Sequence, residues 1–275
     1  MNLTIGMAAY NNPEQVWWTL QGLKLYQDVE DCELLVVDNQ GNEKIQDVCI
    51  DTYVRYETFT RVNGTGPARN AIFDFASGDF VLVLDSHVLL WPDAIKKLKA
   101  WLDANPEEAR NMIHGPIVLK RQQEDKALPM VDRAFTHYED VWRAQMWGTW
   151  APKEGIAIED LPEEAFEIKM MGCGLFGCRK DSWLRFHKDC RGFGGVEGII
   201  HAKYRHHGRR VLCLPFMLWV HRFGAPLPGY PLQLRDRIRN FLLGFEEIGM
   251  DPEPIYRHYG EAKVRAIADE INQRL

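Results

Sequence analysis

The 275-residue sequence has no apolar run that approaches the roughly 20 residues of a membrane-spanning helix. Its first residues enter a strand-like segment at Leu3, Thr4 and Ile5, without the basic stretch and cleavage site of a secretion signal. Internal repeats and low-complexity tracts are also missing from the sequence. We therefore expect a soluble cytoplasmic protein, or one of the host cytoplasm if the source is viral, that forms no stable association with membranes.

Positive charge is scarcer than negative charge: 33 Lys and Arg residues stand against 39 Asp and Glu residues, which gives a formal net charge of −6. This balance argues against a protein that coats nucleic acids by bulk electrostatics. The six cysteines lack the CxxC spacing of a zinc site, so we expect buried free thiols. The 46% hydrophobic content is sufficient for one large core or two modest ones.

Short apolar segments alternate with helical patterns in the first 90 residues, in the order strand, helix, strand, strand, helix, strand. The expected strands cover residues 2–10, 34–38, 54–57 and 80–85. This alternation is typical of an α/β fold with a mostly parallel central sheet flanked by helices. Ligands of such sheets bind at the carboxyl ends of the strands, where Tyr10, Asp38 and Asp85 are expected to face one crevice.

The chain is organised around the buried strand that ends in Asp85, Ser86 and His87. Asp85 and His87 are two residues apart, so their side chains can lie on the same side and share one cation between a carboxylate oxygen and an imidazole nitrogen. The alternative is an ordinary end of a strand at which both side chains are merely solvated.

The pattern is less regular in the second half of the chain. A further strand is expected at 112–118, and 120–167 is charged and irregular, with Trp142, Trp147 and Trp150 close together. Tryptophans in a loop beside a crevice are platforms for sugars, whereas a minor hydrophobic core under the loop is the alternative.

Glu197 follows the flexible stretch Gly192–Gly195 and is expected to begin a helix, where a carboxylate stabilises the helix N-terminus. Two short strands are expected at 209–214 and 218–221, the second of which ends in His221. The glycine- and proline-rich residues 224–229 could form a lid, and the last forty residues have helical periodicity.

Taken together, these segments resemble glycosyltransferase family 2 with a GT-A fold, and in detail the polypeptide N-acetylgalactosaminyltransferase branch with its bacterial and viral relatives. The resemblance covers residues 2–225. It is carried by Thr65–Asn70, Gly78–His87, Gly174-Leu-Phe, Phe193-Gly-Gly195 with a following acid, and Val220-His221-Arg-Phe223.

The resemblance implies a nucleotide-sugar donor, a UDP-sugar first of all, with a divalent cation, Mn²⁺ or Mg²⁺, held by Asp85, His87 and His221. One carboxylate and two imidazoles suit manganese, which would stabilise the charge of the leaving diphosphate. The resemblance also implies a set of donor-binding residues: Ala8, Tyr10, Asp38, Asp85, Ser86, Arg69 and Arg222. The base and ribose would lie near Ala8, Tyr10 and Asp38. Arg69 would approach the nucleotide, and Arg222 would contact the diphosphate.

Glu197 is a departure from the polypeptide N-acetylgalactosaminyltransferases, which have Gly-Gly-Glu-Asn where this chain has Gly-Gly-Val-Glu. Its acid falls where inverting relatives carry their catalytic acid. We therefore interpret Glu197 as a general base that accepts the proton of the acceptor hydroxyl. The neighbouring branch is retaining, so the stereochemistry is left open.

Several readings of the acceptor stay open: a protein side chain, a glycan, or a hydroxymethylated base in viral DNA. The basic stretch 203–210 and the set Arg235, Arg237 and Arg239 could follow DNA phosphates, or they could be solvated helix faces. Trp147 and Trp150 are the weak candidates for acceptor contacts. A non-catalytic binding module and a nucleotidyltransferase or sugar-nucleotide hydrolase are the rivals to a glycosyltransferase.

The resemblance implies a GT-A domain over residues 1–228, with a nucleotide-binding half at 1–118 and an acceptor half at 119–228. A helical C-terminal extension follows at 229–275. The oligomeric state is not predicted by the sequence.

Overall fold

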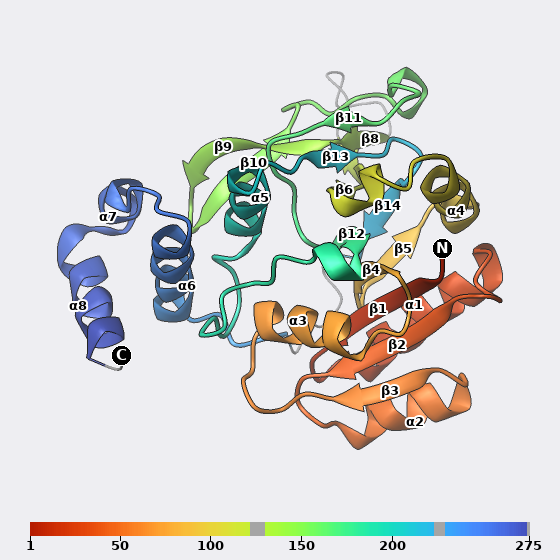
Figure 1. The fold of residues 1–275 in the computed structure, drawn as a ribbon, viewed down its shortest axis with the longest axis horizontal. Helices are drawn as coiled ribbons and strands as arrows, with labels where there is room; N and C mark the ends of the chain where they lie inside the picture. The colour runs from red at the N-terminus through yellow and green to blue at the C-terminus, as the bar shows by residue number, and fades with distance from the viewer. Residues whose placement is uncertain (122–129, 223–228, 274–275) are drawn as a thin grey trace.

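The computed structural model describes residues 1–121, 130–222 and 229–273. Its centre is an eight-stranded sheet with the strand order β11-β13-β6-β12-β4-β1-β2-β3 (Figure 1). The strands of this sheet are β1 (Leu3–Ala9), β2 (Glu33–Asp38), β3 (Arg55–Thr58), β4 (Phe80–Asp85), β6 (Met112–His114), β11 (Phe166–Glu167), β12 (Leu175–Arg179) and β13 (Val211–Cys213). Strands β4, β1, β2 and β3 are parallel, and β12 is antiparallel to its neighbours β4 and β6.

The expected α/β fold with a mostly parallel sheet is therefore confirmed. Strands β1 and β4 are apolar on both faces and almost fully buried, as strands between two layers must be. The helices of this half are α1 (Pro13–Tyr26), α2 (Glu43–Asp51), α3 (Thr65–Phe75) and α4 (Ala94–Ala104). In α1 the stripe Val16, Leu20 and Leu23 is buried, as its spacing predicts.

Two smaller sheets complete the fold. A four-stranded sheet has the order β5-β14-β7-β8, and β9 and β10 form a hairpin. Their strands are β5 (Val88–Leu90), β7 (Ile117–Arg121), β8 (Val131–Phe135), β9 (His137–Arg143), β10 (Met146–Ala151) and β14 (Trp219–His221).

The remaining helices are α5 (Glu197–His206), α6 (Leu234–Glu247), α7 (Glu253–Tyr259) and α8 (Glu261–Asn272). Helices α6 to α8 form a group beside α5 and the β9–β10 hairpin (Figure 1). The expected helical C-terminus is confirmed, and α6 packs directly on α5.

Three expectations about local structure are wrong. Residues 112–118 form two strands, β6 and β7, because the chain turns at Gly115-Pro116 and passes from one sheet to another. Within the range 120–167, the described residues 120–121 and 130–167 are not irregular, since they contribute to β7 and form β8, β9 and β10. Helix α2 was not expected between β2 and β3, although Ile45, Val48 and Cys49 pack on the core with the i, i+3, i+4 spacing of a helical stripe.

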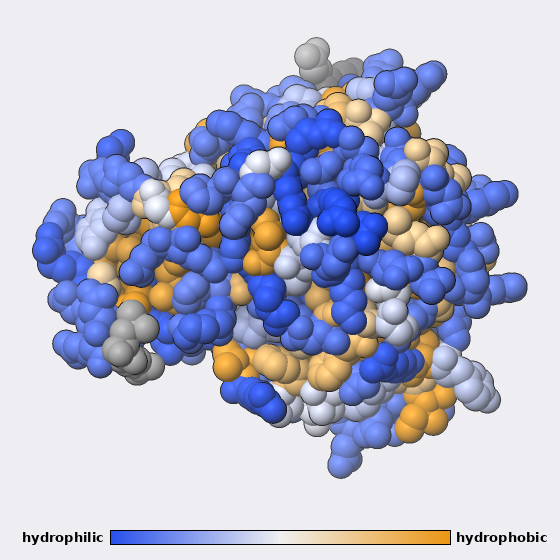
Figure 2. Space-filling model, in the orientation of Figure 1, coloured by the Kyte–Doolittle hydropathy of each residue, from blue (hydrophilic) through white to orange (hydrophobic). Residues whose placement is uncertain are grey.

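The stretch proposed as a lid lies outside the described residues except for Gly229. On the face shown in Figure 2, hydrophilic residues dominate and apolar residues form scattered patches. Among residues 1–121, 130–222 and 229–273, the structure has no helix long and apolar enough to cross a membrane.

Glu33 connects three strands and a turn at the start of β2. Its carboxylate accepts hydrogen bonds from the Thr4 hydroxyl (2.6 Å), the Ser77 backbone N–H (2.7 Å) and Arg55 Nη1 (2.7 Å). Burial alone would raise the pKa of Glu33, but these donors lower it to about 2.

We expect Glu33→Gln to lower the free energy of unfolding by roughly 1–3 kcal/mol at neutral pH, because three donors lose a charged acceptor. The pKa of Glu33 is lower in the folded state, so its stabilisation is complete above the ordinary pKa near 4.5 and disappears as pH falls towards 2. Urea denaturation between pH 7 and pH 3 should show the two proteins converging at the acidic end. An equal difference at every pH would contradict this linkage.

Candidate functional site

The carboxyl ends of β1 and β4 border the main cavity, which has a volume of about 420 Å³. In the parallel register Ala8 lies beside Asp85, so residues at the ends of both strands face the same space. The lining contains Ala8, Tyr10, Asn12, Thr65, Arg69, Asp85, Ser86, His87, Phe193, His221, Gly229, Tyr230 and Leu232. Its size and its position at the ends of the strands are those of a small-molecule site.

The pairing of two short strands brings His221 to His87 across 134 residues of chain. Strands β5 and β14 are antiparallel, His221 lies opposite Val88, and the Arg222 N–H donates to the His87 carbonyl oxygen at 3.0 Å. The two imidazole Nε2 atoms are 2.8 Å apart. One ligand atom from each of Asp85, His87 and His221 lies within 4.8 Å of the other two. The predicted convergence of these three side chains is therefore present.

The protonation states fit a cation. Burial lowers the pKa of His87, and burial together with the neighbouring His87 lowers the pKa of His221 to about 4. Both rings are neutral at pH 7 and offer nitrogen lone pairs. Burial would raise the pKa of Asp85, but the charge of Arg69, the two histidines and the hydrogen bond from Arg69 together lower it, so the carboxylate is ionised. One carboxylate and two neutral imidazoles form a suitable ligand set for Mn²⁺.

Arg69 lies on α3, beneath the cavity, and its Nη2 donates to Asp85 Oδ1 at 2.8 Å. Arg69 is 4% exposed, yet its Nε and Nη1 have no hydrogen-bond partner among the described residues. Burial alone would lower the pKa of Arg69, and the charges of Asp85 and Glu197 more than offset that effect. A buried guanidinium with two unused donors at a cavity wall is suited to an anionic ligand.

Other unpartnered polar atoms border the same cavity. They are Thr65 Oγ1, His87 Nδ1 and Tyr230 Oη, each buried without a hydrogen-bond partner in the described part of the chain. Buried polar groups in native proteins are nearly always paired, so this gathering points to a polar ligand.

Gly174 allows the strands to meet at the site. A Cβ at this position would lie 2.8 Å from the Trp219 ring and 3.4 Å from Asp85 Oδ2. Its carbonyl oxygen accepts a hydrogen bond from the Asp85 N–H at 2.9 Å. Any side chain here would push β14, and with it His221, away from Asp85.

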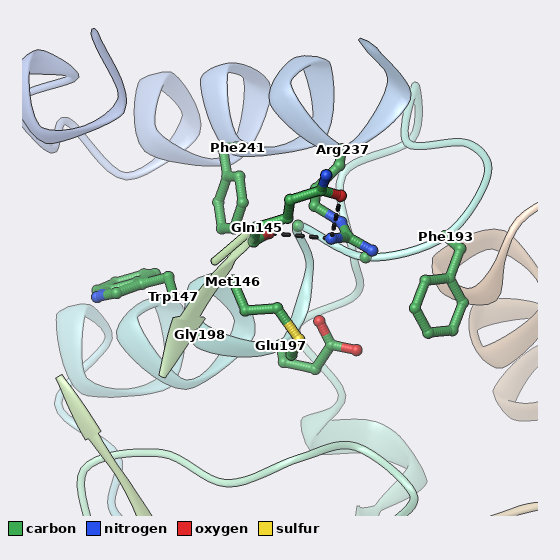
Figure 3. A pocket seen from close by; sticks show the side chains of 10 residues that line it. Gln145, Met146, Trp147, Phe193, Glu197, Gly198, Arg237 and Phe241 are labelled. Carbon is green, nitrogen blue, oxygen red and sulfur yellow. Dashed lines mark hydrogen bonds between the residues drawn. The ribbon is translucent and has the colours of Figure 1, made fainter. Parts of the chain in front are cut away.

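Glu197 begins α5, as its sequence position predicts, and lines a second, small cavity (Figure 3). Phe193 lines both cavities, so the two spaces adjoin at its ring. Burial raises the pKa of Cys173 and of Tyr138, and the charges of Glu197 and Asp85 raise both pKa values further. The two carboxylates therefore lie near the same groups.

The loops that precede α3 and α5 are bonded to each other. The Thr65 N–H donates to the Gly192 carbonyl oxygen at 3.0 Å, and the Gly192 N–H donates to the Asn63 carbonyl oxygen at 2.8 Å. A Cβ on Gly64 would lie 2.7 Å from the Gly192 nitrogen. The helices that carry Arg69 and Glu197 thus begin from one bonded pair of loops.

Besides Glu197, four residues with proposed roles lie outside the main cavity lining. Asp38 is fully buried, and its carboxylate accepts hydrogen bonds from Gln40 N–H, Asn42 N–H and the Tyr56 hydroxyl. Trp147 is 6% exposed and packs on Trp142 and Phe245, which is the hydrophobic-core alternative, although it also borders the Glu197 cavity.

Arg222 and Trp150 line another cavity, of about 630 Å³, which His221 also borders. The Arg222 guanidinium lies 5.4 Å above the Trp18 ring, and its Nη1 is buried with no hydrogen-bond partner among residues 1–121, 130–222 and 229–273. These two residues therefore adjoin the Asp85, His87 and His221 cluster without facing the main cavity.

Several residues of the main cavity were not predicted as site residues, among them Asn12, Thr65 and Tyr230. Asn12 has the position of a helix cap, but its side chain bonds Ser86 Oγ and the Tyr10 N–H instead. Thr65 stands in the predicted glycine-rich turn, so its polar side chain was a usable signal. Tyr230 stacks on Tyr10 with ring centroids 4.3 Å apart, and nothing in its sequence neighbourhood indicates this contact.

The comparisons with known proteins agree with this geometry. The model of "Glycosyl transferase family 2" matches residues 4–158, whereas a comparison with curated proteins finds no match. Among solved structures, GalNAc-T7 with UDP, GalNAc and Mn²⁺ is similar with a TM-score of 0.67 and 14% identity over 90% of this chain. The chain spans about half of that protein, 48% of its length.

Two other structures have the same fold. The mannosyltransferase PcManGT from Pyrobaculum calidifontis, in complex with GDP-Man and Mn²⁺, gives a TM-score of 0.56 at 16% identity, covering 99% of this chain and 75% of its own. S. aureus TarS 1–349 in complex with UDP-GlcNAc gives 0.56 at 14% identity, covering 95% of this chain and 71% of its own. At these identities the likeness shows the GT-A fold.

We expect Asp85→Asn to lower the free energy of unfolding by about 2–4 kcal/mol without added metal, because buried Arg69 loses its counter-charge. Urea denaturation measures the effect. The matched control is Asp181→Asn, which breaks the exposed pair with Arg179 and should cost less than about 1 kcal/mol. Equal effects of the two substitutions would contradict the assignment of Asp85 as the partner of a buried charge.

Proposed function

Because the chain belongs to glycosyl transferase family 2, we propose that it is a metal-dependent glycosyltransferase that moves a sugar from a nucleotide-sugar donor to a hydroxyl acceptor. The observation that carries this proposal is the convergence of Asp85, His87 and His221 at the wall of one cavity. A module that only binds sugars has no need of this ligand set beside an acid on the acceptor side.

The donor is proposed to lie in the main cavity, with its base and ribose near Ala8 and Tyr10 and its diphosphate near Ser86 and Arg69. The unpartnered Nε and Nη1 of Arg69 support the diphosphate position, because they can donate to phosphate oxygens. UDP is the proposed nucleotide, since GalNAc-T7 and TarS were both solved with UDP or a UDP-sugar. The three donors that already bond Asp38 leave its proposed contact with a uracil N–H as the weakest part of the assignment.

Asp85, His87 and His221 would hold a Mn²⁺ or Mg²⁺ ion. When bound, such an ion stabilises the negative charge on the leaving diphosphate. Arg69 adds a second, fixed positive charge on the same side and keeps Asp85 ionised.

Glu197 is proposed as the general base. Its carboxylate would accept the proton of the acceptor hydroxyl while that oxygen bonds to the anomeric carbon and the bond to the diphosphate breaks. Its position at the start of α5, in a cavity that adjoins the donor cavity at Phe193, supports this role. A single displacement of this kind inverts the anomeric configuration.

Protein, glycan and modified DNA all remain candidate acceptors. Ion pairs already engage basic residues of both stretches that could follow DNA phosphates: Lys203 with Glu247, Arg210 with Glu108, and Arg235 with Glu270. The DNA acceptor is therefore not the one that we favour.

A screen of nucleotide sugars tests the donor and metal assignments. We expect one donor to raise the melting temperature of the protein only with Mn²⁺ present, since a ligand that binds the folded state stabilises it. His87→Ala should abolish the metal-dependent shift, and the control Asp181→Asn should keep it. No shift with any donor would refute the proposal.

Glu197→Gln tests the base. We expect kcat to fall by about 10²–10⁴-fold while the Mn²⁺-dependent shift with donor is unchanged, because only proton transfer is lost. Turnover near that of the wild type would exclude Glu197 as the base. NMR of the product linkage separates inversion from retention, and a retained configuration would exclude the single displacement.

A further inference from the structure

Arg237, on helix α6, is a buried cation with no acidic partner among the described residues. It is 8% exposed, and its Nη1 donates to the Gln145 carbonyl oxygen at 3.0 Å and to Gln145 Oε1 at 3.3 Å. Both acceptors are neutral. A buried charge that only neutral groups compensate is costly in a folded protein.

Other arginines near this helix are paired with acids. Arg191 bonds Asp236 at 2.6 Å, and the exposed Arg235 pairs with Glu270 on α8. Arg235 and Arg237 are two residues apart on a helix, so their side chains lie on different faces. The set Arg235, Arg237 and Arg239 therefore does not form one stripe that could follow phosphates. Arg237 differs from Arg235 because it is buried.

One edge of the Arg237 guanidinium is unused. Nε is buried without a hydrogen-bond partner, and the Arg237 bonds to the described residues all involve Nη1. Nε and Nη2 together form the edge that binds carboxylate or phosphate with two parallel hydrogen bonds. Gly194 lies against this edge: a Cβ there would be 2.5 Å from Nε and 3.1 Å from Nη2, so only a glycine leaves room for the guanidinium in this position.

Arg237 shares the small cavity with the proposed base. The lining includes Glu197, Phe193 and Gly194, and Figure 3 shows the charged ends of Glu197 and Arg237 gathered around one hollow with Phe193. The Arg237 guanidinium carbon lies 5.8 Å from the Phe193 ring centroid. Because Phe193 also lines the main cavity, a group bound at Arg237 lies next to the space proposed for the donor.

We propose that the free edge of Arg237 binds an anionic group, a carboxylate or a phosphate, of an acceptor whose hydroxyl faces Glu197. This inference rests on the proposed function and adds the chemical class of the acceptor to it. The C-terminal helices would thereby contribute a specificity residue to the site. No carboxylate of the described residues forms an ion pair with Arg237, and the anion would be that partner.

Inorganic phosphate is the first probe, titrated by calorimetry into protein saturated with UDP and Mn²⁺ so that the proposed diphosphate position is filled. We expect binding to the wild type and at least about 30-fold weaker binding to Arg237→Met. Arg235→Met is the matched control, because it removes an arginine of the same helix that lies in an exposed ion pair, and it should bind phosphate like the wild type. Equal binding by the wild type and Arg237→Met would refute the site.

Acceptor assays separate the two sources of the anion. Methyl glucoside, its 6-phosphate and methyl glucuronide are compared as acceptors with the donor found in the screen. We expect a charged acceptor to be preferred, and Arg237→Met to raise its KM by at least about 30-fold with little change for the neutral glycoside. Preference for the phosphate or for the carboxylate identifies the source. Equal use of all three by the wild type would overturn the proposal.

Arg237→Lys keeps the charge but loses the two-donor edge, and it guards against loss of folding in Arg237→Met. We expect it to bind phosphate more weakly than the wild type and to unfold at a similar urea concentration. Wild-type binding of phosphate by Arg237→Lys would refute recognition by that edge. If the donor stabilises the protein and is hydrolysed but anionic acceptors are not preferred, this inference alone is refuted. If no donor binds, the proposed function is refuted.

Discussion

The site depends on the antiparallel pairing of β5 and β14, two strands of three residues each. This pairing places His221 beside His87 and leaves Asp85 at the end of the neighbouring β4. Its backbone hydrogen bonds fix the two imidazoles, and Gly174 provides the space that lets Trp219 of β14 approach Asp85. The three residues of the cluster stand at or next to strand ends, so short side chains are sufficient to bring their ligand atoms together. The register of the strands therefore sets the geometry of the cluster.

Buried polar groups of the central sheet have hydrogen-bond partners, whereas several buried polar groups beside the cavity have none among the described residues. The strands of the central sheet are apolar and paired, and Glu33 and Asp38 each accept several hydrogen bonds. Around the cavity, by contrast, Arg69, Thr65 and Tyr230 keep buried polar atoms without partners. Native structures retain such unsatisfied groups chiefly where function requires them, so the orphaned atoms mark the site as clearly as the cavity does.

The sequence predicted those parts of the site that follow from local pattern. Buried strands that end in Asp85 and near Tyr10, and an acid at the start of α5, are readable from period and position. Tyr230 could not be placed, because its stacking on Tyr10 is a contact between distant segments. Residues 131–151 were misjudged because the β9–β10 strands bury tryptophans against α6 without regular alternation. Arg237 was grouped with Arg235 because the sequence does not show that Arg237 is buried and Arg235 exposed.

The bonded loops at Gly64 and Gly192 have a consequence for kinetics. The segments that begin α3 and α5 share hydrogen bonds and leave no space for a side chain between them. A displacement of one segment would therefore carry the other along, so Arg69 and Glu197 would shift as a single rigid unit. In the proposed function Arg69 contacts the diphosphate and Glu197 the acceptor, so a movement that releases one ligand would also displace the group that binds the other.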